Sequence, residues 1–225
     1  MHGMLDNIAW HALSGAQAAC ATGTAEARRY APGFSPIVGF PDPAQPRFDV
    51  LAPFCERGEH FYNVGWSGKA PAGWQIDSET VIVKMLWDAP MPAADEAPDA
   101  VALGPQHAPQ AVELATLTRP GPFGPRTLEL GECFGCFDDG RLIAMAGERM
   151  HAGTLREVSG VCTHPDHQGR GLARRLMLML IRREMLRGET PFLHVMHGNT
   201  GARGLYARMG FREYSQSVVR VVSQA

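Results

Sequence analysis

Residues Val158–Ala173, VSGVCTHPDHQGRGLA, carry the most informative local pattern in this sequence. Its first residues are β-prone and end at Pro165, after which Gly169 and Gly171 indicate a turn. Leucines and methionines then recur at helical spacing, which predicts a helix beginning at the second glycine. Glycines at a helix N-terminus let the backbone approach a ligand, and the free N–H groups there favour a phosphate. Without further context, the same pattern is also an ordinary joint between a strand and a helix.

The residues around this turn resemble those of a known family. Gln168, Gly171 and Ala173 have the Gln/Arg-x-x-Gly-x-Gly/Ala spacing of the acyl-CoA loop in the GNAT N-acyltransferase superfamily. The sequence is similar to the FR47-like branch in particular, over roughly residues 110–215. The other residues that carry the resemblance are RLIAMAGERM at 141–150, PFLHV at 191–195, Asn199, Ala202, Tyr206 and Gly210–Phe211.

The resemblance implies an α/β (α+β) fold, with a GNAT-type mixed central sheet flanked by helices. Residues 89–109 are rich in proline and alanine, which predicts a linker and a domain boundary near residue 100. We expect residues 1–100 to form a smaller N-terminal α/β region of unclear role, by analogy a reduced GNAT-like half. Residues 101–225 are expected to form the GNAT acyltransferase domain.

Hydrophobic periodicity and turn residues predict the individual elements. Ser14 is expected to cap an alanine-rich helix within residues 1–30, and TVIVKMLW at 80–87 is the clearest N-terminal strand. In the second region we expect a helix at 109–117, strands at 132–137, 141–149 and 155–163, a helix at 171–187, a strand at 192–196, a helix at 200–209 and a strand at 211–222.

Composition excludes several classes of protein. The 225 residues are 45% hydrophobic and 20% charged, as in a globular protein with a sizeable core. A net charge of −2 does not suggest a nucleic-acid partner, and no apolar run is long enough to span a membrane. The N-terminal MHGMLDNIAW lacks the features of a signal peptide, so the five cysteines indicate reduced thiols in a cytoplasmic protein. The oligomeric state stays open.

The resemblance implies acetyl-CoA, or another short acyl-CoA, as co-substrate. Backbone N–H groups of the turn are expected to hold its pyrophosphate, and Arg170 either adds a charged contact or lies on the surface. Its pantetheine arm would pair with the strand at 161–163, whose N–H groups would bind the thioester oxygen. Asn199 resembles a family residue near the cofactor, and it is also a natural helix cap. The expected cofactor-binding residues are Val161, Cys162, Thr163, Gln168, Gly169, Arg170, Gly171, Leu172, Ala173 and Asn199.

Acyl transfer from a thioester needs a neutral amine, a stabilised carbonyl oxygen and a proton for the leaving thiolate. Tyr206 matches the family's usual acid, although a tyrosine on an apolar helix stripe is also a common core residue. Glu157 matches the strand glutamate that acts as base in the histone-acetylating branch. Glu148 on the adjacent strand, or a water molecule, is the alternative base. The irregular loop TRPGPFGPR at 118–126 either covers the acceptor site or simply joins two elements.

The remaining reactive residues predict no metal site. The histidines lack the helical spacing of a zinc site, and His194 in a buried strand is expected to be a core histidine. Cys133 and Cys136 form a single C-x-x-C that fits a strand entering a turn, and Cys162 has no evident base for covalent catalysis.

The sequence therefore predicts an N-acetyltransferase that moves an acetyl or short acyl group to a primary amine by direct attack in a ternary complex. A small-molecule or peptide amine is the expected acceptor, with no nucleic-acid or membrane partner. The alternatives are a non-catalytic acyl-CoA-binding or regulatory module, and a thiol or metal enzyme.

Overall fold

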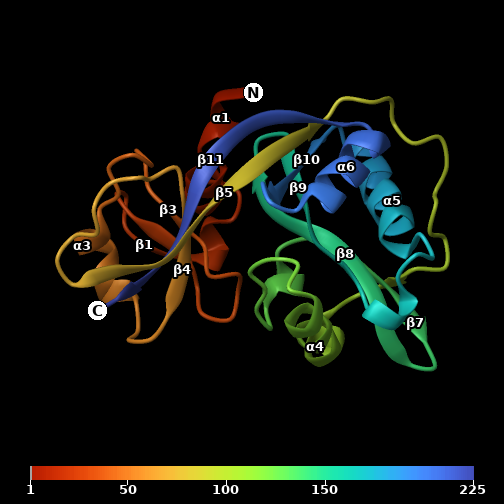
Figure 1. Ribbon diagram of the computed structural model, residues 1–225, viewed down its shortest axis with the longest axis horizontal. Coiled ribbons are helices and arrows are strands. Elements are labelled where there is room, and N and C mark those ends of the chain that lie inside the picture. The colour runs from red at the N-terminus through yellow and green to blue at the C-terminus, as the bar shows by residue number, and fades with distance from the viewer. Residues whose placement is uncertain (1) are drawn as a thin grey trace.

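The computed structural model describes residues 2–225. A mixed eight-stranded sheet organises the chain in the order β4-β11-β5-β10-β9-β8-β7-β6 (Figure 1). Its neighbours are antiparallel, except that β10 runs parallel to β9. The strands are β4 His60–Val64, β5 Trp74–Trp87, β6 Val101–Ala102, β7 Cys133–Asp138, β8 Arg141–Ala152, β9 Leu155–Thr163, β10 Thr190–Met196 and β11 Phe211–Gln224.

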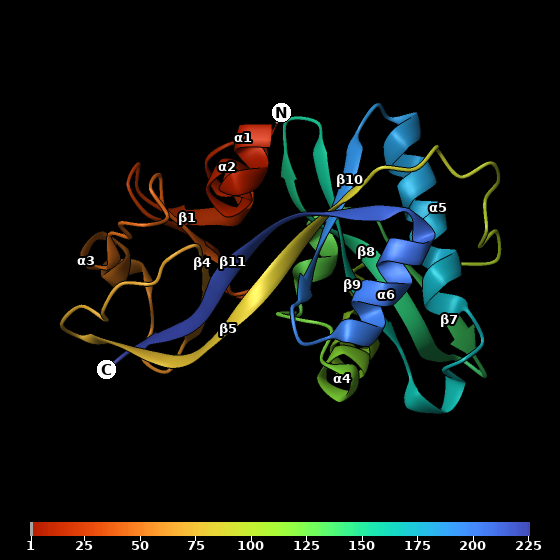
Figure 2. The same ribbon diagram turned by 45° about the horizontal axis from the view of Figure 1, so that its top comes forward.

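Helices cover both faces of this sheet. Because successive side chains of a strand point to opposite faces, neighbouring residues of one strand contact different helices. On β8, Ala144 and Ala146 face the core that includes α5, Leu172–Leu186. Met145, between them, packs with the buried side of α4, Ala108–Thr118. The helix α6, Thr200–Met209, packs beside α5 (Figure 2). The mixed sheet flanked by helices is therefore confirmed.

The N-terminal half shares the large sheet. The long strands β5 and β11 pair along their length. They run from the part of the fold that contains α5 and α6, the C-terminal lobe, into the part formed by residues 2–64, the N-terminal lobe (Figures 1 and 2). The boundary expected near residue 100 thus falls between β5 and β6 of one sheet. The N-terminal elements are α1 His2–Asp6, α2 Ile8–Ser14, β1 Ala21–Gly23, β2 Arg28–Tyr30, β3 Val38–Gly39 and α3 Phe48–Leu51, and β1-β2-β3 form a small sheet of their own.

The expected helix capped by Ser14 is wrong in its position. The helix α2 ends at Ser14, whose Oγ donates a hydrogen bond to the carbonyl of Trp10 at 2.6 Å. Ile8, Ala9, Ala12 and Leu13 of α2 are buried, so burial of this apolar face outweighs the helix propensity of the alanines that follow. Those alanines form only a short 3₁₀ turn at Ala18–Cys20 and the beginning of β1.

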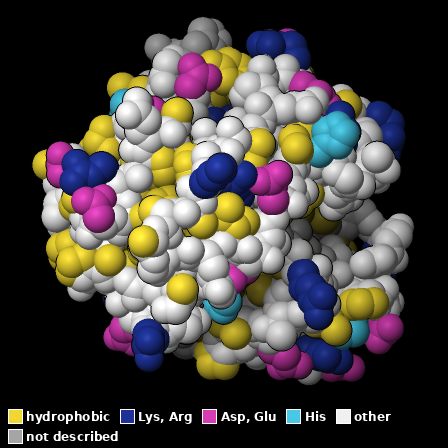
Figure 3. All heavy atoms as spheres, turned by 60° about the vertical axis from the view of Figure 1, so that its left-hand side comes forward, with side chains coloured by type: hydrophobic (Ala, Val, Ile, Leu, Met, Phe, Trp, Pro, Cys, Tyr) yellow, Lys and Arg dark blue, Asp and Glu magenta, His cyan; other side chains and the backbone are white. Residues whose placement is uncertain are grey.

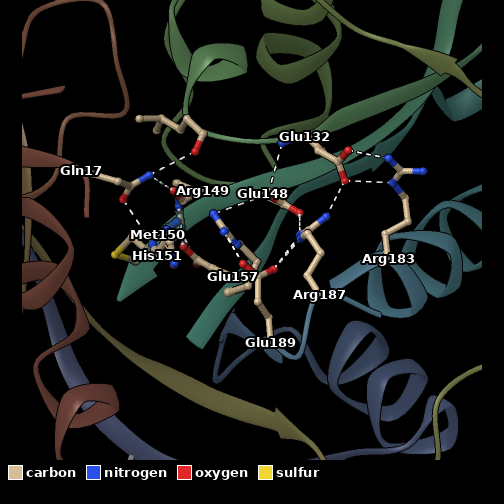
Figure 4. A network of polar contacts seen from close by, with 12 residues as sticks. Gln17, Glu132, Glu148, Arg149, Met150, His151, Glu157, Arg183, Arg187 and Glu189 are labelled. Carbon is tan, nitrogen blue, oxygen red and sulfur yellow. Dashed lines mark hydrogen bonds and ion pairs between the residues drawn. The ribbon is translucent and has the colours of Figure 1, made fainter. Parts of the chain in front are cut away.

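A buried glutamine fastens the N-terminal lobe to β8. The Gln17 amide donates to the carbonyl of Arg149 at 2.6 Å (Figure 4). Its oxygen accepts from the hydroxyl of Tyr30 at 2.6 Å. It also accepts from the backbone N–H of His151 at 3.2 Å. Every polar atom of this side chain is therefore paired, which makes its burial inexpensive.

Charged groups at the end of α5 surround a buried carboxyl that is not hydrogen-bonded. Arg183 and Arg187 bind Glu132, and Arg187 also binds Glu148 (Figure 4). Glu184, on the inner face of α5, is fully buried, and both its carboxylate oxygens lack a hydrogen-bond partner among the described residues. Burial, reinforced by the charge of Glu148, raises the pKa of Glu184 well above its ordinary value. Glu184 therefore retains its proton in the folded protein.

Glu184→Gln is expected to become progressively more stable than the wild type as pH rises. Above an ordinary pKa of 4.5 the unfolded chain releases a proton that the folded chain keeps. Stability therefore falls with rising pH toward the folded pKa, by at most about 1.4 kcal/mol per pH unit. Glutamine does not titrate, so the difference in the free energy of unfolding between variant and wild type should grow as pH rises above the ordinary pKa of 4.5. Urea unfolding at each pH measures it, with the exposed Glu113→Gln as control. A difference independent of pH would contradict a protonated Glu184.

Candidate active site

The site forms where two parallel strands separate. β9 and β10 pair only from Leu155 opposite Thr190 to Glu157 opposite Phe192. Beyond this point β10 continues along β5, whereas β9 continues along β8. The register of β9 against β8 gains one residue around Gly160, which has a φ of 64°, and such a bulge bends a strand. The backbone that follows the bulge therefore has no partner strand on its β10 side.

A cavity of about 680 Å³ occupies this separation. Both halves of the chain line it. From the N-terminal half come residues 6–9, 37–40, 43, 62–64, 82 and 84. From the C-terminal half come residues 118–122, 149–150, 161–163, 167–174, 194–196, 199, 202, 205–206 and 219.

The glycine turn presents unpaired amides at one end of the cavity. Gly169 and Gly171 have φ angles of 76° and 73°, in the left-handed region that favours glycine. The first helical hydrogen bond of α5 joins the N–H of Arg175 to the carbonyl of Gly171, so the preceding amides lack a helical acceptor. A Cβ added at either glycine would meet nothing within 4 Å. The turn therefore combines free donors, the helix dipole and open space, as an anion site requires.

The structure brings the predicted cofactor residues together. All ten line the cavity: Val161, Cys162, Thr163, Gln168, Gly169, Arg170, Gly171, Leu172, Ala173 and Asn199. The Asn199 side chain also caps α6, accepting from the N–H of Ala202 at 3.1 Å. Asn199 is therefore both a helix cap and a residue of the cavity lining. The exposed Arg170 lies 2.9 Å from Nδ1 of His167. Their roles toward acyl-CoA stay predictions.

Tyr206 lies on the same wall of the cavity as Asn199. Its ring packs edge-on against Phe211, with centroids 6.1 Å apart at 65°. Burial raises the pKa of the Tyr206 hydroxyl, so the group is protonated at neutral pH. The residue therefore packs in the core, as one interpretation predicts, and still faces the cavity with a proton to donate.

Neither predicted carboxylate base lines the cavity. Glu157 is fully buried and accepts from Arg149 Nη2 at 2.6 Å and from Arg149 Nε at 3.0 Å. Burial alone would raise the pKa of Glu157, but Arg149 and His194 overcome it and lower the pKa to about 2. Glu148 is likewise buried, and it is paired with Arg187 and Arg156. The geometry disfavours direct proton transfer to either group.

The cavity is instead lined by polar residues that were not predicted as site residues, among them His194, which was expected to be a core histidine. Lys84 and His194 occupy opposite positions on β5 and β10, and both line the cavity with Arg149. Lys84 Nζ donates to the carbonyls of Leu5 and Asp6 at 2.7 Å each, and burial lowers its pKa to about 8. A lysine and a histidine inside otherwise apolar strands were the available signal, because such residues are seldom buried without a function or a partner.

The loop after α4 forms part of the cavity wall. Residues 118–122 line it, and Arg119 adopts a left-handed φ of 51°. This loop belongs to the segment expected either to cover the acceptor site or to join two elements. The loop lies beside Arg149 and beside the N-terminal residue Ser35, whose Oγ donates to the carbonyl of Pro122 at 2.9 Å.

The cysteines do not form reactive pairs. All five are outside disulfides, and burial raises the pKa of Cys162 to about 11 and that of Cys133 to about 12. Thiols with such pKa values are poor nucleophiles. Across residues 2–225, no group of three or more His, Cys, Asp or Glu is arranged to hold a metal ion. No helix in the same range is long and apolar enough to cross a membrane.

Comparison with solved structures identifies the fold. A GNAT-family protein from Novosphingobium aromaticivorans DSM 12444 is 33% identical, with 98% of each chain covered and a TM-score of 0.88. A GCN5-related N-acetyltransferase from Kribbella flavida is 20% identical, with 84% of this chain and 80% of that chain covered and a TM-score of 0.52. A GCN5-related N-acetyltransferase-like protein from Streptococcus suis 89/1591 is 15% identical over 89% and 84% of the chains, with a TM-score of 0.54.

The chain belongs to the GNAT family. Within it, residues 133–221 match the family described as FR47-like protein. No curated protein matches the sequence. The similarity to the Novosphingobium protein covers 98% of this chain and therefore includes the N-terminal half. Membership of this family supports acyl transfer as the general class of reaction.

Proposed function

We propose that this chain is an N-acetyltransferase that transfers an acetyl or another short acyl group from acyl-CoA to a primary amine by direct attack in a ternary complex. One observation carries the proposal: a single cavity joins the glycine turn to the buried polar residues Lys84, Arg149 and His194. A donor thioester and an acceptor amine both need access to one reaction point. We place the donor beside the glycine turn, at the donor end, and the acceptor beside these polar residues, at the acceptor end.

The donor end has the features that acyl-CoA requires. The amides at the start of α5 and the guanidinium groups of Arg170 and Arg174 offer donors and positive charge for the pyrophosphate. The unpaired edge of β9 at 161–163 offers backbone groups to the pantetheine arm and an N–H to the thioester oxygen. Tyr206, on α6, lines the same cavity and is the proposed proton donor for the leaving thiolate.

The acceptor end is built from the N-terminal half and the loop at 118–122. This half is therefore a wall of the site as well as a partner of the sheet. A small molecule or the end of a peptide is the acceptor we propose. Lys and Arg side chains alternate with Asp and Glu on the face shown in Figure 3, without a patch of one sign, which does not favour a nucleic-acid partner. Five cysteines without a disulfide support a reducing, cytoplasmic setting.

Release of CoA thiol tests the proposal. Acetyl-CoA is incubated with the protein and an amine panel of glycine, ethanolamine and a lysine-containing peptide, and thiol formation above the no-amine rate is followed. Mass spectrometry of the acceptor confirms the amide bond. Amine-dependent release is expected. Acyl-CoA binding without release by any amine would favour the alternative, a non-catalytic acyl-CoA-binding module, since neither Glu157 nor Glu148 faces the cavity.

A further inference from the structure

We infer that His194, positioned by Glu157, is the base that removes a proton from the acceptor amine. The inference rests on the proposed acyl transfer. It assigns the role of general base to a histidine that the sequence alone predicted to be a core residue. It begins with the two ring nitrogens of His194. Nδ1 lies 2.8 Å from Oε1 of Glu157, whereas Nε2 has no hydrogen-bond partner among the described residues.

The unpaired nitrogen marks a place for a ligand. Buried side-chain nitrogens are nearly always hydrogen-bonded, and an exception calls for a missing partner. The His194 side chain is only 5% exposed, yet the residue lines the cavity. Because Glu157 holds Nδ1, Nε2 is the nitrogen left for a group that enters from the cavity, and since Nε2 is itself buried, the group would reach it by a small shift of the cavity wall. An amine N–H is a donor that satisfies it.

The surroundings set the tautomer of His194. Glu157 is ionised and accepts two hydrogen bonds from Arg149 and one from the N–H of Met150, so its remaining neighbour, Nδ1 of His194, must donate to it. The proton on Nδ1 leaves a lone pair on Nε2. An acceptor nitrogen held by a carboxylate on its opposite side is the arrangement of an oriented general base.

The charges around His194 come from every strand that packs against it. Glu157 is on β9, Arg149 on β8 and Lys84 on β5, opposite His194. Burial lowers the pKa of His194, and Lys84 and Arg149 lower it further, whereas Glu157 opposes them. The ring is therefore neutral at physiological pH and free to accept a proton. The same charges keep an approaching ammonium group acidic.

The proton and electron movements balance. One N–H proton of the acceptor ammonium passes to Nε2 of His194, and the freed lone pair forms the C–N bond at the acyl carbon. The C–S bond breaks with its electron pair on sulfur. The sulfur takes a proton from Tyr206, which regains one from the nitrogen as the amide forms, and the His194 imidazolium releases its proton to water.

The dependence of kcat/KM on pH tests this assignment, with acetyl-CoA as donor and the most active amine of the panel as acceptor. His194→Gln keeps an amide N–H for Glu157 but does not titrate near neutrality. We expect it to lower kcat/KM by about 10²–10⁴-fold and to remove the inflection that His194 gives the wild-type profile. Calorimetry should show unchanged acetyl-CoA binding. His197→Gln, three residues further along and outside the cavity lining, is the matched control and should behave as wild type.

Glu157→Gln tests the positioning role separately. Loss of the carboxylate lowers the pKa of His194 further, so the inflection should move to lower pH while the rate falls less than in His194→Gln. Where this variant does not fold, ¹⁵N spectra of wild-type His194 replace it. They should show the proton on Nδ1 and a neutral ring at about pH 7. A proton on Nε2 would overturn the assignment.

Wild-type turnover separates this inference from the proposed function. Amine-dependent transfer by wild type, with His194→Gln equal to wild type in rate and pH profile, would overturn the role of His194 alone. No transfer by wild type to any amine would overturn the proposed function.

Discussion

Gly171→Glu is expected to abolish acyl-CoA binding while the fold is retained. The new carboxylate would extend from the start of α5 into the space beside the unpaired amides, where we place the pyrophosphate. It would occupy the anion site and repel phosphate charges. We expect affinity to fall by at least about 10²-fold, which corresponds to about 2.7 kcal/mol. Isothermal titration calorimetry with acetyl-CoA measures it.

Gly171→Gln is the matched control for this change. Gly171 has a φ of 73°, so any side chain there carries a backbone cost of roughly 1–2 kcal/mol, which the two variants share. Glutamine has nearly the size of glutamate without its charge. A large difference in affinity between the variants, at equal melting temperature, isolates the charge. Equal affinities, or an affinity unchanged from wild type, would refute the anion site at this turn.

Tyr206→Phe is expected to reduce turnover and to leave acyl-CoA binding intact. The substitution removes only the hydroxyl and keeps the edge-on packing against Phe211. General acid assistance typically contributes about 10²–10⁴-fold, and we expect the low end because CoA thiolate is already a fair leaving group. The measurement is kcat under conditions in which the chemical step limits the rate.

The packing interpretation of Tyr206 predicts a different outcome. If the hydroxyl serves only the core, the variant should lose thermal stability while activity per folded molecule stays the same. Melting temperature and kcat are therefore measured on one preparation. Wild-type kcat would exclude Tyr206 as the acid, although the chain would still belong to an acyltransferase family.

Local sequence patterns were sufficient where one element carries its own signal. Residues 158–173 predicted the strand, the glycine turn and the helix, and the structure places β9 and α5 there. Each of these depends on backbone preferences and short-range periodicity, which neighbouring residues alone determine. At Ser14 the same reasoning was wrong, because burial of Leu5, Ile8 and Leu13 against the rest of the molecule outweighed local propensity.

The second wall of the cavity is decided by contacts between distant segments. β5 ends before residue 90, yet it pairs with both β10 and β11 near the other end of the chain. This pairing turns the N-terminal half from an expected separate region into a wall of the site. No local pattern encodes it, because strand pairing depends on which hydrophobic faces are buried together.

Short-range patterns were enough to predict the family, the central elements and the glycine turn with its helix, since these residues are neighbours in the chain. The tertiary fold determines the opposite wall of the cavity. It turned Glu157 away from the cavity and brought Arg149 and His194 between that carboxylate and the open space. These placements follow from the divergence of β9 and β10 after Glu157. Residues before this point lie between paired strands, whereas residues beyond it can line the cavity.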